Sequence, residues 1–146
     1  MPAIELIPVT EHNFRDCVKL VVADDQTDYV ASNLYTLAQS YVYPSWQPRA
    51  IHADGQLVGF VATGLDSETG HQWIIRFMIG KDLQGKGYGK AALLAIIDQL
   101  KAASPESEIR LSYVPGNEVA ERLYRAVGFE ATGEIDDGEV VMRLSR

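Results

Sequence analysis

The sequence has 146 residues, of which 47% are hydrophobic and 23% charged, a balance that is typical of a folded globular protein and excludes a disordered chain. This length predicts a single domain over residues 1–146, with enough chain to bury a hydrophobic core. The formal net charge of −7 argues against a nucleic-acid partner and is compatible with a small cationic substrate, although a solvated acidic surface is equally common.

The first half of the chain predicts a strand, two helices and a proline-containing segment that is not helical. The strand is expected at residues 4–9, and the helices at about 13–23 and 28–41 carry apolar residues at helical spacing. Residues 43–48 contain two prolines, each of which restricts its own backbone and that of the preceding residue. This segment is therefore expected not to be a regular helix.

A hairpin and a third long strand follow. Strands at 49–53 and 56–65 flank Asp54-Gly55, a favoured two-residue hairpin turn. The next strand, at 71–79, leads directly into a glycine-rich turn at residues 84–90. A strand, closely spaced glycines and a helix therefore follow one another in this order.

The second half predicts two helices and three strands. A helix at 90–102 has a clear apolar stripe, a strand covers 108–114, and a helix at 118–127 ends at Gly128, the usual residue for a left-handed cap. A hairpin of two short strands, 129–135 and 139–144, closes the chain. The whole order indicates an α/β fold, a mixed sheet flanked by helices with antiparallel hairpins and a βαβ crossover.

No secretory signal or membrane-spanning segment is expected from the sequence. No apolar run approaches the roughly 20 residues that cross a bilayer, so no membrane partner is expected. Residues 1–5 lack the basic start of a secretory signal. The only cysteine, Cys17, cannot form an internal disulfide, which fits a reducing compartment, and we expect a cytoplasmic protein. Because Cys17 shares an apolar helix face with Phe14 and Val21, its expected role is structural.

The glycine-rich turn at 84–90 has the physical features of an anion site. Glycines let the backbone approach a phosphate, the helix start offers free N–H groups, and Lys86 and Lys90 add positive charge. A P-loop needs Ser or Thr after its last lysine, where this chain has Ala91. The glycines are spaced G-x-G-x-G, which is not the Rossmann G-x-G-x-x-G. A turn that merely shapes a loop is the alternative interpretation.

Two motifs extend the interpretation of this turn. Gln84-x-x-Gly87-x-Gly89 resembles the Q/R-x-x-G-x-G/A signature of the GNAT superfamily of acyl-CoA N-acyltransferases. Residues 117–129 are similar to the family's N-x-x-A-x-x-L-Y-x-x-x-G-F segment. The resemblance implies a mixed, mostly antiparallel sheet of about seven strands, about four flanking helices, and a cleft where the strand before the turn splays from its neighbour.

The same resemblance implies acetyl-CoA as the acyl donor and no metal. Backbone groups of Phe77, Met78 and Ile79 would bind the pantetheine arm and the thioester carbonyl, and Asn117 would hydrogen-bond the arm. The pyrophosphate would lie on the turn, whose binding residues are Gln84, Gly85, Lys86, Gly87, Tyr88, Gly89 and Lys90. Backbone amides suit both tasks because they are held in place before the ligand arrives.

Tyr124 matches the tyrosine that protonates the departing CoA thiolate in this family. A phenol with an unperturbed pKa near 10 is a weak but adequate acid beside a thiolate. The alternative is core packing, since Tyr124 borders the apolar stripe of Val119, Leu123 and Val127 on its helix.

The general base is not assigned. Many family members use a carboxylate on the strand before the turn, and residues 71–79 contain no acid. His71 lies at the far end of this strand, and His12 and His52 are weaker candidates.

The acceptor is expected to be a small-molecule amine. Residues 73–90, 57–60 and 140–142 resemble bacterial spermine/spermidine N-acetyltransferases. A polyamine site needs carboxylates for its charges and aromatic faces for its methylenes. The candidate substrate-binding residues are Asp28, Tyr29, Trp46 and Trp73.

The sequence departs from the polyamine-acetylating pattern at two positions. Ile75 and Gly80 stand where such enzymes often have acids, so an amino acid, a small monoamine or a peptide N-terminus stays open as the acceptor. A non-catalytic acyl-CoA-binding module is the alternative from another class. Dimers are common in this family, so the resemblance is also compatible with a homodimer.

Overall fold

The computed structural model describes residues 1–144, which form a seven-stranded sheet in the order β1-β2-β3-β4-β5-β7-β6. Within these residues every neighbouring pair is antiparallel except β4 and β5. The strands are β1 (Ile4–Pro8), β2 (Trp46–Ala53), β3 (Gln56–Leu65), β4 (Gln72–Ile79), β5 (Ile109–Tyr113), β6 (Phe129–Asp136) and β7 (Glu139–Leu144). This confirms the mixed, mostly antiparallel sheet.

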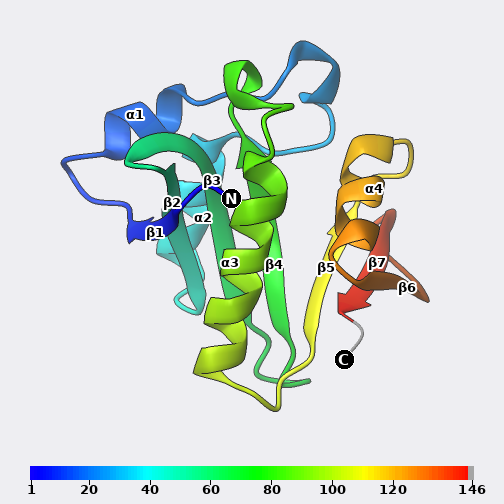
Figure 1. The fold of residues 1–146 in the computed structure, drawn as a ribbon. Coiled ribbons are helices and arrows are strands. Elements are labelled where there is room, and N and C mark those ends of the chain that lie inside the picture. Colours follow the sequence, from blue (N-terminus) through cyan, green and yellow to red (C-terminus); the bar gives the residue numbers. More distant parts are fainter. Residues whose placement is uncertain (145–146) are drawn as a thin grey trace.

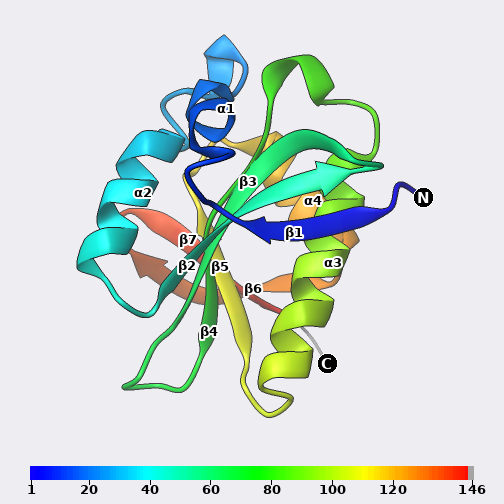
Figure 2. The same cartoon turned by 90° about the vertical axis from the view of Figure 1, so that its left-hand side faces the viewer.

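Four α-helices of the described residues cover the two faces of the sheet (Figures 1 and 2). One face carries α1 and α2, and the other carries α3 and α4 (Figure 2). Their bounds are α1 (Phe14–Lys19), α2 (Asn33–Val42), α3 (Tyr88–Ala103) and α4 (Glu118–Ala126), and two 3-10 turns cover Asp24–Gln26 and Lys81–Leu83. None of the helices in this part of the chain is long and apolar enough to span a bilayer.

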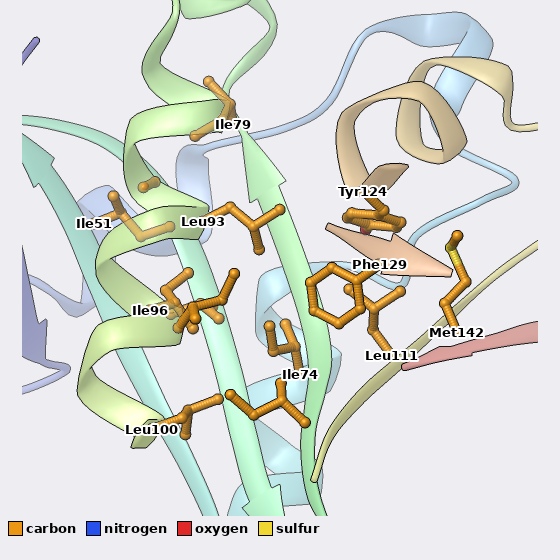
Figure 3. Close-up of a cluster of buried hydrophobic side chains, with 14 of the residues drawn as sticks. Ile51, Ile74, Ile79, Leu93, Ile96, Leu100, Leu111, Tyr124, Phe129 and Met142 are labelled. Carbon is orange, nitrogen blue, oxygen red and sulfur yellow. The ribbon is translucent and has the colours of Figure 1, made fainter. Parts of the chain in front are cut away.

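The main core lies between α3 and the sheet (Figure 3). Leu93, Ile96 and Leu100 of α3 are buried, as their helical spacing predicts, and they pack with side chains such as Ile74 of β4. Each such side chain stabilises the fold by roughly 1.5–3 kcal/mol through burial. A smaller cluster around Phe60 lies on the face under α1 and α2. The α3 helix therefore holds β4, the strand that leads into the glycine-rich turn.

The predicted hairpin turns have the expected backbone. Asp54 and Gly55 have φ values of 50° and 82°, and Asp137 and Gly138 have 49° and 79°. Positive φ at both central residues is the mark of the type I′ turn, whose twist matches paired strands.

The β4 and β5 strands separate after a short contact. Their parallel pairing covers Gln72↔Ile109 and Trp73↔Arg110, whereas β4 stays paired with β3 as far as Ile79. Beyond Trp73, the edge of β4 that faces β5 has no strand partner among the described residues. This is the splayed arrangement that the family resemblance implies.

Three element boundaries differ from the prediction. The first helix ends at Lys19 rather than near residue 23, because the chain turns extended at Leu20 and the Val21 carbonyl accepts a hydrogen bond from Lys81 N–H. The second helix begins at Asn33 rather than residue 28, because Ser32 caps it by accepting the Tyr35 N–H at 3.1 Å. The β2 strand begins at Trp46 rather than residue 49, so it takes in part of the proline-containing segment that was expected not to be a regular helix.

Candidate active site

Two cavities meet where β4 and β5 separate. The first, of about 310 Å³, lies beside the glycine-rich turn, and we call it the glycine-loop cleft. The cleft is lined by Val22, Gln26, Val30, Phe77, Met78, Ile79, Gln84, Gly85, Gly87, Gly89, Lys90, Asn117, Val119, Ala120, Leu123 and Tyr124. It therefore gathers the end of β4, the turn and one face of α4.

The second cavity, of about 350 Å³, lies on the other side of Tyr124, and we call it the Glu139 cavity. Its lining residues are Thr27, Asp28, Tyr29, Val30, Ala31, Ile74, Ile75, Arg76, Phe77, Ser112, Tyr113, Val114, Asn117, Tyr124 and Glu139. Four residues line both cavities, namely Val30, Phe77, Asn117 and Tyr124. A group bound in one cavity can therefore reach a group bound in the other beside these four side chains.

The glycine-rich turn presents open backbone to the cleft. Gly85 and Gly87 have φ values of 77° and 85°, and a Cβ placed on either residue would meet no atom within 4 Å. Gly87 is the N-cap of α3, so the first N–H groups of this 16-residue helix lie beside the turn. Such an arrangement fits an anionic phosphate, which gains both close backbone contact and the helix dipole.

Gln84 has its side chain engaged within the protein. Its Nε2 donates to the Ile79 carbonyl at 2.9 Å, and it exchanges two further hydrogen bonds with the side chain of Gln26. The side chain therefore fastens the turn to the end of β4 and to the 3-10 turn at Asp24–Gln26. This role was not anticipated for a residue expected to contact the ligand directly.

Asn117 is the N-cap of α4, where its Oδ1 accepts the Ala120 N–H at 3.3 Å. Its Nδ2 has no hydrogen-bond partner among residues 1–144, and the residue lines both cavities. The cap therefore holds Asn117 in place and leaves an N–H donor for a bound molecule.

Tyr124 lies at the junction of the two cavities. It is 8% exposed, and its ring meets Phe129 edge-on with centroids 6.2 Å apart, within the buried cluster of Figure 3. Burial raises the pKa of Tyr124 to about 12, and the negative charge of Glu139 adds to this rise. The phenol therefore stays protonated at neutral pH and can act as a proton donor.

A comparison with protein families matches residues 14–129 to the acetyltransferase (GNAT) family. The chain belongs to the GNAT family of acetyltransferases. It is 35% identical to the spermine/spermidine N(1)-acetyltransferase of Bacillus subtilis (strain 168), over 96% of this chain and 97% of that protein. The protein is accordingly an acetyl-CoA-dependent N-acetyltransferase.

Solved structures of GNAT acetyltransferases have the same fold. One is the PaiA N-acetyltransferase from Thermoplasma acidophilum in complex with coenzyme A, with a TM-score of 0.71, 16% identity and coverage of 99% of both chains. Another is the aminoglycoside acetyltransferase AAC(6')-Ib in complex with coenzyme A, with a TM-score of 0.78 and 20% identity over 99% of this chain and 95% of that one.

The acetyltransferase brings most of the predicted donor-binding residues into the glycine-loop cleft. Phe77, Met78 and Ile79 line it, as do most of the turn and Asn117. Two members of the turn are exceptions. Lys86 is exposed outside the lining, and the Tyr88 side chain packs against the main core. Tyr88 can therefore offer its backbone N–H but not its side chain to a ligand, whereas Lys86 keeps an exposed side chain as well.

The predicted acceptor residues are divided between two places. Asp28 and Tyr29 line the Glu139 cavity, whereas Trp46 and Trp73 line a separate pocket with Gly64 and other residues. Trp73 is four residues before Phe77 on β4, about 13 Å along an extended strand, which accounts for the separation. The prediction that the two tryptophans share a site with Asp28 is not met.

Trp46 has a different partner. The guanidinium of Arg76 lies 5.8 Å from its ring centroid and donates to Oε1 of Gln39 at 3.1 Å. Arg76 thus connects β4 to α2 and to the start of β2, and it also lines the Glu139 cavity. Trp46 therefore supports a cavity residue and does not line the cavity itself.

Glu139 and Ser112 line the candidate site, although the sequence did not indicate them. Ser112 Oγ donates to Oε1 of Glu139 at 3.0 Å, and both residues line the Glu139 cavity. The sequence pattern places Glu139 at the start of a strand but cannot say which strand lies beside it. That Ser112 and Glu139 are neighbours follows only from the pairing of β5 with β7, in which Ser112 lies opposite Val141.

The histidine considered as a base lies elsewhere. Nδ1 of His71 is 3.7 Å from Oε2 of Glu108, and His71 lines neither cavity. In residues 1–144, no group of three or more His, Cys, Asp and Glu side chains is placed to hold a metal ion.

Proposed function

We propose that this enzyme transfers the acetyl group of acetyl-CoA to a primary amine of a polyamine such as spermidine or spermine. The observation that carries the proposal is the Glu139 cavity, which holds the carboxylates of Asp28 and Glu139 and meets the glycine-loop cleft at Tyr124. The relative at 35% identity over nearly its whole length is named for spermine and spermidine, which supports the same class of acceptor.

The donor is proposed to lie in the glycine-loop cleft. Its pantetheine arm would pair with the free edge of β4 at Phe77, Met78 and Ile79, and Nδ2 of Asn117 would donate to the arm. The Gln84 side chain holds the turn in place. The pyrophosphate would accept hydrogen bonds from the backbone N–H groups of Gly85, Lys86, Gly87, Tyr88, Gly89 and Lys90.

Tyr124 is proposed to protonate the CoA thiolate as the tetrahedral intermediate breaks down. The residue lines both cavities, so it lies where the donor and the acceptor would meet. Because burial raises the pKa of Tyr124, the phenol is fully protonated before the reaction begins. A thiolate formed beside this phenol would then take its proton directly.

The charges of the Glu139 cavity suit a multiply charged cation. Two carboxylates, Asp28 and Glu139, face one guanidinium, that of Arg76, which is already engaged by Gln39 and Trp46. The ring of Tyr29 adds an aromatic face that can cover methylene groups and attract an ammonium. Trp46 and Trp73 have no part in this proposal.

We propose that residues 1–146 form one acetyltransferase domain, which works in the cytoplasm. A reducing compartment suits Cys17, which is a free and fully buried thiol. Burial raises the pKa of this thiol, and the nearby negative charge of Asp16 raises it further. The reactive thiolate is therefore disfavoured.

An amine panel tests the acceptor. The protein is incubated with acetyl-CoA and spermidine, spermine, butylamine, an amino acid, a peptide with a free N-terminus or an aminoglycoside, and free thiol is followed. We expect the two polyamines to give the highest kcat/KM. Equal rates with butylamine would overturn the polyamine assignment. Thermal stabilisation by CoA without thiol release from any amine would identify a non-catalytic binder instead.

A further inference from the structure

We infer that Glu139 is a catalytic residue that binds the reacting ammonium and accepts its proton, an inference that rests on the proposed polyamine acetylation. The β4 strand, whose residues border the donor, contains no acid. Glu139 comes instead from the first position of β7, on the opposite side of the gap between β4 and β5. The base is therefore supplied by the far wall of the cavity.

The strand pattern of β7 directs Glu139 into the cavity. Val140 and Met142 pack against the main core, so Glu139, one position before Val140, projects from the opposite face of the sheet. On β5, Leu111 and Tyr113 likewise belong to the core, and Ser112 between them projects to the same side as Glu139. The two side chains thus meet on the cavity side of paired strands.

A single hydrogen bond orients the carboxylate. Ser112 Oγ donates to Oε1 of Glu139 at 3.0 Å, and Oε2 has no hydrogen-bond partner among residues 1–144. Glu139 is partly exposed, so it is hydrated and able to return a proton to solvent. One oxygen is therefore held by the protein, and the other is free for the ammonium of the acceptor.

Of the two carboxylates that line the cavity, Glu139 is the one whose charge raises the pKa of the Tyr124 phenol. Asp28 lies in the loop between the 3-10 turn at Asp24–Gln26 and α2. The ionisable groups that face Glu139 or pair with it are Asp28, Tyr29, Arg76, Tyr113, Tyr124 and Asp136. With Glu139 at the attacking amine, Asp28 is left to bind a distant ammonium of the same polyamine.

The proposed steps balance. The acceptor enters as an ammonium, and one proton passes to Glu139. The nitrogen lone pair then forms the C–N bond to the thioester carbonyl carbon, whose π electrons move to oxygen. When this oxyanion collapses, the C–S bond breaks and the thiolate takes the Tyr124 proton. The protonated amide nitrogen returns a proton to Tyr124, and Glu139 releases its own proton to solvent, so the products are the amide, CoA and one H⁺.

Glu139→Gln is the decisive variant, because its amide oxygen can still accept the Ser112 hydrogen bond. We expect kcat to fall by about 10²-fold or more, the range of general acid–base catalysis. The melting temperature and the CoA affinity by calorimetry should match the parent. Asp137→Asn is the matched control, since it removes one charge from the same hairpin at an exposed turn residue outside the cavity.

Two further variants separate catalysis from binding. Glu139→Ala should regain part of its kcat when formate is added, because a small carboxylate can occupy the vacated space. Asp28→Asn should raise KM for spermidine by a larger factor than it lowers kcat. A Glu139→Gln enzyme with parental kcat and only a raised KM would overturn the proton-transfer role.

Two assays in sequence distinguish a wrong assignment of Glu139 from a wrong assignment of the acceptor. The parent enzyme is assayed first, and if it ignores polyamines the proposed acceptor is wrong. The Glu139 series is then run with whichever amine of the panel gives the highest rate. A parental kcat for Glu139→Gln with that amine would overturn the inference on its own.

Discussion

Gln26 and Gln84 exchange two side-chain hydrogen bonds at the glycine-loop cleft, although they are 58 residues apart in the sequence. Nε2 of Gln26 donates to Oε1 of Gln84 at 3.2 Å, and Nε2 of Gln84 donates to Oε1 of Gln26 at 2.9 Å. Because Gln84 also binds the Ile79 carbonyl, the pair connects the N-terminal loop, the end of β4 and the glycine-rich turn. The shape of the donor site therefore depends on both halves of the chain.

Gln26→Ala should weaken CoA binding and leave the fold intact. A net hydrogen bond contributes about 1 kcal/mol, so releasing one side of the turn should raise the CoA Kd by roughly three- to tenfold. Calorimetry with CoA measures the change. Gln56→Ala, at an exposed strand start, is the control, and equal Kd values for the two variants would remove the proposed role of the pair.

Gly87→Ala and Gly133→Ala form a matched pair. Both glycines have positive φ, 85° and 89°, and at each of them a Cβ would meet no atom within 4 Å. Left-handed backbone costs an L-residue roughly 1–2 kcal/mol, so both variants should lose a similar free energy of unfolding in urea. CoA affinity should fall for Gly87→Ala alone. A similar fall for Gly133→Ala would show that strain, rather than contact with the pyrophosphate, governs binding.

Tyr124→Phe should lower kcat by about 10²-fold with little change in CoA affinity, because only the proton donor is lost. Initial rates of thiol release and calorimetry with CoA measure the two quantities. Tyr35→Phe, at an exposed position of α2, serves as the control for removing a phenol. Unchanged turnover of the Tyr124 variant on the true acceptor would contradict the assigned role.

The raised pKa of Tyr124 has a consequence for stability at high pH. The folded state holds the phenol proton up to about pH 12, whereas an unfolded tyrosine loses it near pH 10. The stabilisation is therefore fully present below pH 10 and is lost as the pH rises to 12, a change of about 3 kcal/mol. Urea unfolding of the parent and of Tyr124→Phe, compared between pH 9 and 12, isolates this contribution.

The pKa of the Tyr124 phenol can also be used to test its interaction with Glu139. Since the Glu139 charge helps to raise the pKa of Tyr124, Glu139→Gln should lower that pKa, which NMR of ¹³C-labelled tyrosine can follow without any substrate. An unchanged Tyr124 titration in this variant would mean that the two groups do not interact.

Local patterns were sufficient to predict most of the fold. The Asp54-Gly55 turn needs only its own two residues to select a type I′ hairpin, and the stripe of α3 follows from helical spacing. Apolar spacing also explains why the predicted start of α2, at residue 28, is too early. Val30 continues the apolar spacing of the helix toward its N-terminus, but in the fold it lines the two cavities, and the Ser32 cap begins the helix later.

The acceptor side of the site was harder to predict, because it depends on strand order. Glu139 and Ser112 become neighbours only because β7 inserts between β5 and β6, which no local pattern specifies. Residue type alone favours Trp46 and Trp73 as acceptor residues, and it carries no information about position along a strand. Most residues predicted for the donor do line one cleft, since the turn and the end of β4 are close in sequence.

A conjugate that links CoA through an acetyl bridge to a terminal amine of spermidine tests most directly whether donor and acceptor meet at Tyr124. Calorimetry should give a Kd at least tenfold lower than that of CoA, because linked groups bind with a high effective concentration. A CoA conjugate carrying an uncharged chain of the same length should lack this gain. Binding of the spermidine conjugate no tighter than CoA would contradict the account.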